Sequence, residues 1–328
     1  MKQEDIARPK AESTIDSRCR LSRNEFVREY LYPRRPVILS DATAGWSANT
    51  RWTPGFFREN FGSRKVPVAR GKKFYKISID DFFEYAKRSC GLRETGEGEE
   101  EPFYIRNVTV SQAFPELLED FKIAQYFRPD WLQAWPLRSL FPPAKTAYAE
   151  LFIAPPGAKV PLIHRDTYMT HSWMSQIFGR KKFWMVSPEE SNFMYQDQRD
   201  PDHSLVNSIE QPDLERFPLF ARARVRSCML EPGNTLFIPA GWWHIAESLS
   251  VSISLSGNFV NHSNFRDFRA TAVLPRFRGD GRIRRLANQG ILQCHGIACN
   301  LHGSVRRPVV VPPGTLHEAR EGAYEYSD

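Results

Sequence analysis

Two short stretches of this sequence decide its fold: Ala158-Lys-Val-Pro-Leu-Ile-His164-Arg-Asp166 and, 80 residues later, Phe237-Ile-Pro-Ala-Gly-Trp-Trp-His244. In an extended chain, side chains alternate between two faces, so residues two apart project to the same side. If the first stretch is extended, His164 and Asp166 therefore present an imidazole and a carboxylate together. The second stretch reads as an apolar strand that ends in another histidine, and the two strands together predict a single site.

The three side chains of this site are donors for a metal ion. Two imidazoles and one carboxylate on one face of an iron ion leave the opposite face open for a chelating co-substrate and dioxygen, the arrangement of non-haem Fe(II) oxygenases. A His-X-Asp pair by itself carries little information, but together with Gly-Trp-Trp-His it predicts the ligand set His164, Asp166 and His244. His171 is the alternative ligand; we expect it in a loop between strands, outside the set.

The chain after Thr146 predicts a mainly β domain. Its polar and apolar residues alternate in short runs, with turn residues at Pro155-Pro-Gly, Gly179-Arg and Pro232-Gly. Eight short strands with such turns favour a double-stranded β-helix, or jelly roll. The expected strands are residues 146–154, 160–166, 172–178, 182–187, 224–230, 234–239, 242–247 and 250–258. We expect the long segment 188–222 to cross between the sheets.

The sequence divides into four expected parts. Residues 1–20 are polar and expected to be loose, and residues 21–125 form an N-terminal elaboration of helices and strands. Residues 126–273 make up the catalytic jelly roll, and 274–328 are a tail that we expect to be disordered. Within the elaboration, helices are expected to begin at a Ser22–Glu25 capping box, at Thr53-Pro54 and at Ser78, with a further helix over 113–121. Strands are expected over 35–40 and 103–107.

The net charge of +7 is concentrated near the C-terminus. Residues 266–307 contain nine arginines, no lysine and two aspartates, whereas the last 21 residues carry a net charge of −3. The arginine-rich segment has two interpretations: it contacts nucleic acid, or it is a solvated tail. Cys294, His295, Cys299 and His302 are zinc-type donors, but their spacing matches no common zinc motif, which favours residues that bind no metal.

Composition excludes several classes of protein. No apolar run approaches the roughly 18–20 residues that a membrane helix requires, and the first residues lack the apolar stretch of a secretory signal. The five cysteines are odd in number and scattered, unlike a disulfide framework. These features predict an intracellular protein, cytoplasmic or nuclear. They say nothing of its oligomeric state.

Around these residues the sequence resembles the JmjC-domain, cupin-like 2-oxoglutarate oxygenases, over about residues 15–265. From His164 the chain runs through Trp173 to Gly179-Arg-Lys-Lys-Phe-Trp, at the spacing of the arginine demethylase/lysyl hydroxylase subgroup. The stretch from Glu231 to Leu249 is similar to that subgroup and to the asparaginyl hydroxylase of hypoxia-inducible factor. Ser256-Gly-Asn-Phe matches the strand that closes the family's pocket.

The resemblance implies a reaction and its participants. The cofactors would be Fe(II), 2-oxoglutarate as co-substrate, and O2, and the product a hydroxylated or demethylated protein side chain. Lys181 would hold the distal carboxylate of 2-oxoglutarate, with Lys182 pointing outward. Tyr104, Trp173, Ser256 and Asn258 complete the implied co-substrate set.

Some differences and alternatives remain. Pro161 and Met174 stand where the family commonly has threonine and where the lysyl hydroxylase subgroup has asparagine, so two polar contacts near the co-substrate are absent. The alternative substrates are a modified tRNA base and a small peptide-like metabolite. The non-enzymatic alternative is a binding module on an inactive barrel, although the complete ligand set argues against it.

Overall fold

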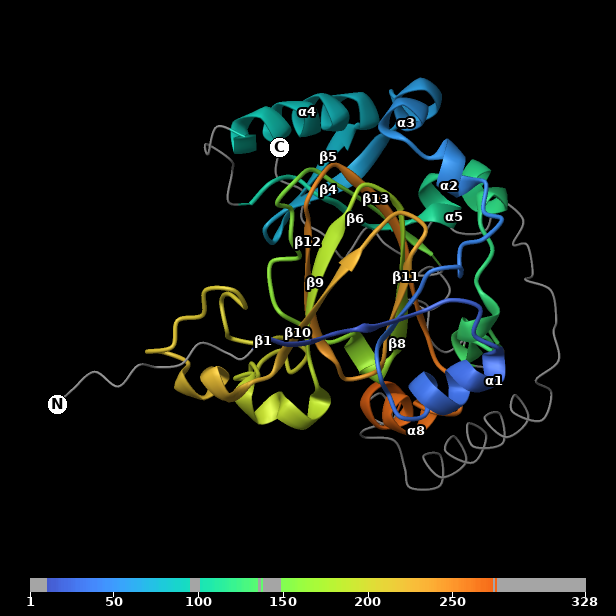
Figure 1. Ribbon diagram of the computed structural model, residues 1–328. Coiled ribbons are helices and arrows are strands. Elements are labelled where there is room, and N and C mark those ends of the chain that lie inside the picture. The colour runs from blue at the N-terminus through green and yellow to red at the C-terminus, as the bar shows by residue number, and fades with distance from the viewer. Residues whose placement is uncertain (1–10, 95–100, 135–136, 138–148, 274, 276–328) are drawn as a thin grey trace.

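The computed structural model describes residues 11–94, 101–134, 137, 149–273 and 275, and within them the expected jelly roll is confirmed (Figure 1). One sheet has the order β1 (Ala11–Thr14), β10 (Val225–Leu230), β9 (Lys181–Val186) and β12 (Trp243–Ser248). The facing sheet has the order β2 (Asp16–Arg18), β3 (Val37–Leu39), β11 (Thr235–Ile238), β8 (His171–Phe178), β13 (Ser252–Phe259), β7 (Glu150–Ala154) and β6 (Ile105–Thr109).

Alternation along the strands sorts side chains into an interior and two outer layers. Phe183 and Met185 of β9 point inward and meet Ile238 of β11, whereas Trp184 and Val186 point outward. The segment 188–222 covers this outer face and contributes Met194, Val206, Phe217 and Phe220 to its apolar cluster. The expected crossing segment thus forms an outer cover of the first sheet.

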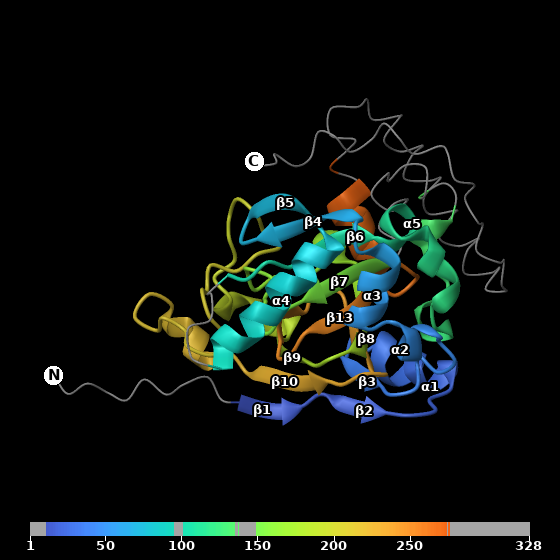
Figure 2. The same cartoon turned by 90° about the horizontal axis from the view of Figure 1, so that it is seen from above.

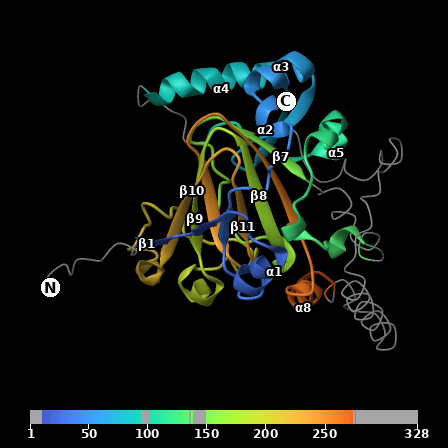
Figure 3. The same ribbon diagram turned by 45° about the vertical axis from the view of Figure 1, so that its right-hand side comes forward.

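The outer face of the second sheet carries the largest apolar cluster. The sheet contributes Trp173, Phe237, Leu255 and Phe259 to this cluster, and the N-terminal elaboration contributes the side chains that pack against them. The helices of this elaboration are α1 (Arg23–Phe26), continued by η1 (Val27–Leu31), α2 (Ala48–Arg51), α3 (Pro54–Phe61), α4 (Ile79–Glu94) and α5 (Val110–Ala113). Figures 1 and 3 show α3 and α4 beyond one end of the barrel and α1 at the other.

Local sequence signals predicted where several of these helices begin. The capping box predicted at Ser22 is present: the Ser22 hydroxyl accepts from the Glu25 amide, and the Glu25 carboxylate accepts from the Ser22 amide. At the start of α3 the Thr53 hydroxyl accepts from the Phe56 amide, and Pro54 occupies the first turn. The helix expected over 113–121 instead comprises the end of α5 and the 3-10 helix η2 (Pro115–Asp120), because Pro115 interrupts the backbone ladder.

Three features differ from the sequence-based expectations. Residues 11–18, expected to be loose, form β1 and β2, which pair in parallel with β10 and β3 (Figure 2). The hairpin of β4 (Lys65–Arg70) and β5 (Lys73–Ser78) was not anticipated. The strand expected over 160–166 is reduced to isolated bridges at Lys159 and His164, because Pro161 has no amide hydrogen to donate.

After β13 the chain forms α8 (Phe265–Phe268) and η8 (Arg269–Val273), which pack on Trp131 at the α1 end of the barrel. The tail 276–328, with its arginine run and Cys294, lies outside the described residues. None of the helices within the described part of the chain is both long and apolar enough to cross a bilayer.

Candidate active site

The two histidines singled out in the sequence lie side by side. The His164 amide donates to the His244 carbonyl at 3.1 Å, the His244 amide donates to the His164 carbonyl at 2.7 Å, and the ring centroids are 4.4 Å apart. Each Nδ1 lies near a carbonyl oxygen two residues earlier, that of Leu162 at 3.0 Å and that of Trp242 at 3.1 Å. Both Nδ1 atoms can thus carry the proton, which leaves each Nε2 with a lone pair for a metal.

Burial keeps one of these imidazoles neutral. The pKa of His164 is lowered to about 4, mainly by burial and less by the neighbouring His244, while nearby Asp166 acts in the opposite direction. A neutral imidazole is the form that binds a metal ion. At neutral pH, His164 is therefore a ready nitrogen donor.

Asp166 lies two residues beyond His164, where the chain enters the 3-10 turn η5 (Thr167–Met169). Its Oδ2 accepts a hydrogen bond from the Ser172 hydroxyl at 2.6 Å, and its Oδ1 accepts one from the Asn258 amide at 3.1 Å. Among the described residues, no three His, Cys, Asp or Glu side chains already surround one point closely enough to enclose an ion. Asp166 and the two histidines instead line one cavity, and as a set of two nitrogen donors and one oxygen donor they fit Fe(II).

This cavity lies between the two sheets and has a volume of about 470 Å³. Its deep wall is apolar, formed by Phe152, Met174, Phe183, Ile238 and Ala246. The polar side chains that line the cavity besides the two histidines and Asp166 are Tyr104, Arg106, Asn107, Glu150, Thr167, Tyr168, Thr170, Ser172, His203, Ser256 and Asn258. A largely apolar cleft with convergent polar groups is the usual form of a small-molecule site.

Lys181 points into the barrel and Lys182 points out. Lys181 is 1% exposed; its ammonium donates to the Tyr104 hydroxyl at 3.0 Å and lies over the rings of Tyr104 and Phe152. Burial lowers the pKa of Lys181 to about 7 and raises that of Tyr104 above its usual range. No carboxylate in the described ranges forms an ion pair with Lys181, so its surroundings suit an anionic ligand.

The remaining members of the expected co-substrate set lie in two different places. Ser256 and Asn258 line the cavity, but the Ser256 hydroxyl donates to the Trp173 carbonyl and Asn258 donates to Asp166. The structure does not bring Trp173 into the cavity. Its ring lies on the outer face of the sheet, stacked 5.8 Å from Phe127, because Ser172 and Met174 take the two inward positions around it.

The alternative ligand, His171, occupies a structural position. His171 is the first residue of β8 rather than part of a loop, and it is fully buried. Its Nδ1 accepts from the Ala240 amide at 2.9 Å, its Nε2 lies 2.8 Å from the Ser263 hydroxyl, and burial lowers its pKa to about 3. These contacts tie β8 to neighbouring loops and leave no nitrogen for a metal.

Sequence reasoning missed one histidine of the cavity wall. His203, from the crossing segment, bridges to His164 in the backbone, with ring centroids 6.1 Å apart. The Asp200 carboxylate lies 2.7 Å from its Nδ1, and Arg165 holds the segment through Asp202. An Asp-X-X-His spacing in a long polar segment was the available signal, but it is too common to identify a site.

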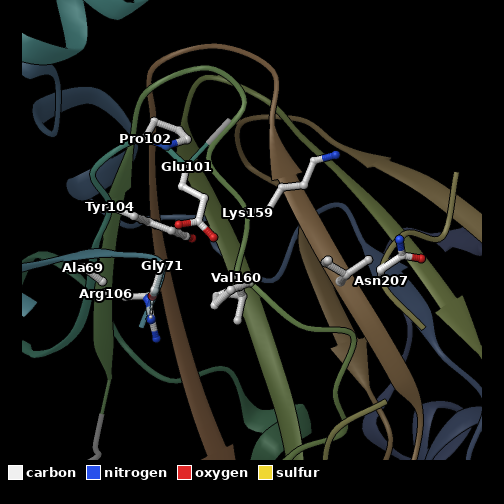
Figure 4. A pocket seen from close by; sticks show the side chains of 11 residues that line it. Ala69, Gly71, Glu101, Pro102, Tyr104, Arg106, Lys159, Val160 and Asn207 are labelled. Carbon is white, nitrogen blue, oxygen red and sulfur yellow. Dashed lines mark hydrogen bonds between the residues drawn. The ribbon is translucent and has the colours of Figure 1, made fainter. Parts of the chain in front are cut away.

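A smaller pocket of about 140 Å³ adjoins this cavity and shares Tyr104, Arg106 and Val160 with it. Figure 4 shows Glu101 above Tyr104, with the Lys159 side chain extending away from both. The Arg106 guanidinium donates to the Gly71 carbonyl at the tip of the β4–β5 hairpin. This hairpin thus forms one lip of the pocket.

Comparisons with known proteins show which family the chain matches. The family described as "Cupin-like domain" matches residues 22–265. The chain is 29% identical over 252 residues to lysine-specific demethylase 8 of Danio rerio, covering 72% of this chain and 55% of that protein. It is 29% identical over 257 residues to tRNA wybutosine-synthesizing protein 5 of Danio rerio, covering 72% of each.

A third relative is named for its cofactors. The 2-oxoglutarate and iron-dependent oxygenase JMJD4 of Gallus gallus is 26% identical over 261 residues, covering 74% of this chain and 58% of that protein. The chain spans about half the length of two of these three relatives.

Proposed function

The chain belongs to the cupin-like domain family, and from that premise we propose that it is an Fe(II)- and 2-oxoglutarate-dependent oxygenase that hydroxylates a protein side chain, or demethylates one through hydroxylation. The observation that carries the proposal is a single cavity lined by two imidazoles, one carboxylate and Tyr104, whose hydroxyl accepts a hydrogen bond from the buried Lys181 ammonium. The donors suit the metal, and the lysine suits the distal carboxylate of the co-substrate.

His164, Asp166 and His244 would hold the metal. When bound, Fe(II) supplies the activation of dioxygen, with 2-oxoglutarate converted to succinate and carbon dioxide as one oxygen atom enters a C–H bond of the substrate. Tyr104 of the cavity wall and Lys181, which donates to the Tyr104 hydroxyl, would orient the co-substrate. The apolar walls at Phe152 and Phe183 would exclude water from the reacting groups.

A protein side chain is the substrate class that the cavity suits best. Its volume of about 470 Å³ must also take the co-substrate, so the remaining space fits one extended side chain better than a bulky modified base. Two of the relatives above are named as a lysine demethylase and as an oxygenase, whereas the third is named for a tRNA nucleoside. The tRNA base is the second candidate on that observation.

Uncoupled turnover tests the reaction without knowledge of the substrate. With Fe(II), 2-oxoglutarate and O2, the purified full chain should form succinate slowly, and His164→Ala or Asp166→Ala should abolish it. Glu215→Ala removes an exposed carboxylate of the crossing segment and should leave the rate unchanged. Succinate formation at the same rate in Asp166→Ala would show the ligand assignment to be wrong.

The substrate class requires a second measurement. Extracts treated with the wild-type chain and with Asp166→Ala are compared for oxygen-dependent mass shifts of +16 in digested protein and in digested tRNA. A shift confined to tRNA nucleosides would replace the protein assignment by the tRNA one.

A further inference from the structure

The Asp166 carboxylate lies on a stretch of chain with little backbone support. It enters η5, where Tyr168 and Met169 adopt φ values of 61° and 56°, a region that side chains other than glycine rarely occupy. No strand ladder includes Asp166, whereas His244 belongs to β12 and His164 is bridged to it. Asp166 is therefore the member of the ligand set that other side chains must orient.

Two facing residues of adjacent strands supply this support. Asn258 of β13 is the direct register partner of Ser172 of β8, and both side chains point into the cavity. Ser172 donates to one oxygen of Asp166 and Asn258 donates to the other. Cross-strand partners stand close together, so the pair can engage both oxygens of one carboxylate at once.

The pair is itself held in place. The Asn258 amide also donates to the Thr170 hydroxyl at 2.9 Å, and Thr170 donates to the Thr167 carbonyl at 3.0 Å. Asn264 donates to the Met169 carbonyl at 3.0 Å and holds the other end of the strained turn. The carboxylate, the turn and β13 therefore form one connected network of hydrogen bonds.

We propose that Ser172 and Asn258 are positioning residues for the metal: they orient the Asp166 carboxylate so that it can bind the ion alongside His164 and His244. This inference rests on the proposed function and reassigns Asn258 from co-substrate to carboxylate support. Residues that hydrogen-bond to a metal ligand commonly contribute 10- to 100-fold to metal affinity.

The test is the affinity of the metal-free full chain for Co(II), followed by its visible absorption, without 2-oxoglutarate. Ser172→Ala and Asn258→Ala should each weaken Co(II) binding by about 10- to 100-fold and change the ligand-field bands. Because both act on one carboxylate, the double variant should fall short of the sum of the two free-energy losses. Ser172→Thr keeps the hydroxyl and should restore binding.

Ser175→Ala is the matched control. Ser175 is a buried serine of the same strand that shares a hydrogen bond with Thr235 and faces away from Asp166. It should lower thermal stability as much as Ser172→Ala does while leaving Co(II) affinity unchanged. A metal affinity in Ser172→Ala and Asn258→Ala equal to that of Ser175→Ala would overturn the proposal. Tighter Co(II) binding in these two variants would also overturn the proposal, because Ser172 and Asn258 would then be holding the carboxylate away from the metal.

The outcome separates this inference from the proposed function. If the wild-type chain binds Co(II) and His164→Ala abolishes the binding, the metal site stands whatever Ser172 and Asn258 do. If the wild-type chain binds no Co(II), both the proposed function and the positioning role are wrong.

Discussion

Lys181 illustrates how one residue can point to a ligand. A cation that is 1% exposed and paired with no carboxylate in the described ranges is costly unless an anion joins it. Its one hydrogen-bond partner there is the Tyr104 hydroxyl, a neutral group. An acid group of a ligand would restore the balance of charge.

Lys181→Ala should weaken 2-oxoglutarate binding far more than Lys182→Ala, by about 2–5 kcal/mol, because a buried ligand carboxylate would lose its charged partner. Lys182 is the matched control, since it points outward over Trp184 and pairs with Glu210. Metal binding should be unaffected in both variants. Titration of the Mn(II)-loaded chain with 2-oxoglutarate measures the difference, and equal affinities would remove the anchor role from Lys181.

The affinity for 2-oxoglutarate should also depend on pH. Burial lowers the pKa of Lys181 to about 7, so the free protein loses the ammonium as the pH rises through 7. Because the charged form binds the carboxylate, affinity should be highest below pH 7 and fall by up to about tenfold per unit above it. Titrations of the Mn(II)-loaded chain at pH 6, 7, 8 and 9 test this dependence. Lys181→Ala should bind weakly at all four, and the same fall in that variant would assign it to another group.

Strand β13 links the cavity to the outer core at the scale of one element. Ser256 and Asn258 face the cavity, and Gly257 between them faces the Trp173 ring. A Cβ at Gly257 would lie 2.8 Å from that ring, closer than side chains tolerate. Trp173, expected to bind co-substrate, therefore supports the strand from behind.

Gly257→Ala should destabilise the protein by about 1–3 kcal/mol, because the Trp173 ring is packed against Phe127 and cannot move without cost. Gly91→Ala is the matched control: no atom lies within 4 Å of its added Cβ, and it lies in α4. That change should stabilise the helix by about 0.5–1 kcal/mol. Denaturant unfolding measures both, and changes of the same sign would contradict the close contact.

At the scale of the whole molecule, the apolar clusters of the described residues reach as far as Val273. Phe268, Ala272 and Val273 are buried beside Trp131, so a chain that ends at Leu274 keeps this cluster. The arginine-rich residues that follow contribute no ligand of the proposed site. The catalytic unit and the charged tail should therefore be separable.

A chain of residues 1–274 should keep the uncoupled turnover of the full chain but bind a polyanion more weakly. Retention on a heparin column at rising salt measures the second property, because salt screens interactions between exposed charges. The full chain with Arg282, Arg284 and Arg285 changed to glutamine should behave like the truncated chain. Equal retention of all three would show that the tail has no part in binding an acidic partner.

The sequence by itself determined what depends on short-range order. Alternation placed Lys181 and Lys182 on opposite faces, the capping box located the start of α1, and turn residues separated the later strands. These features follow from backbone geometry within a few residues, which the local pattern of side chains reports. The His164 and Asp166 spacing with a distant His244 also indicated three side chains that line the cavity.

Only the tertiary structure decided which distant residues meet. Backbone hydrogen bonds are alike in every register, so no local signal pairs Asn258 with Ser172 or brings His203 beside His164. The register follows from burying both outer faces at once, Trp173 under the N-terminal elaboration and Trp184 under the crossing segment. That packing, summed over the whole barrel, is what places two hydrogen-bond donors on the Asp166 carboxylate.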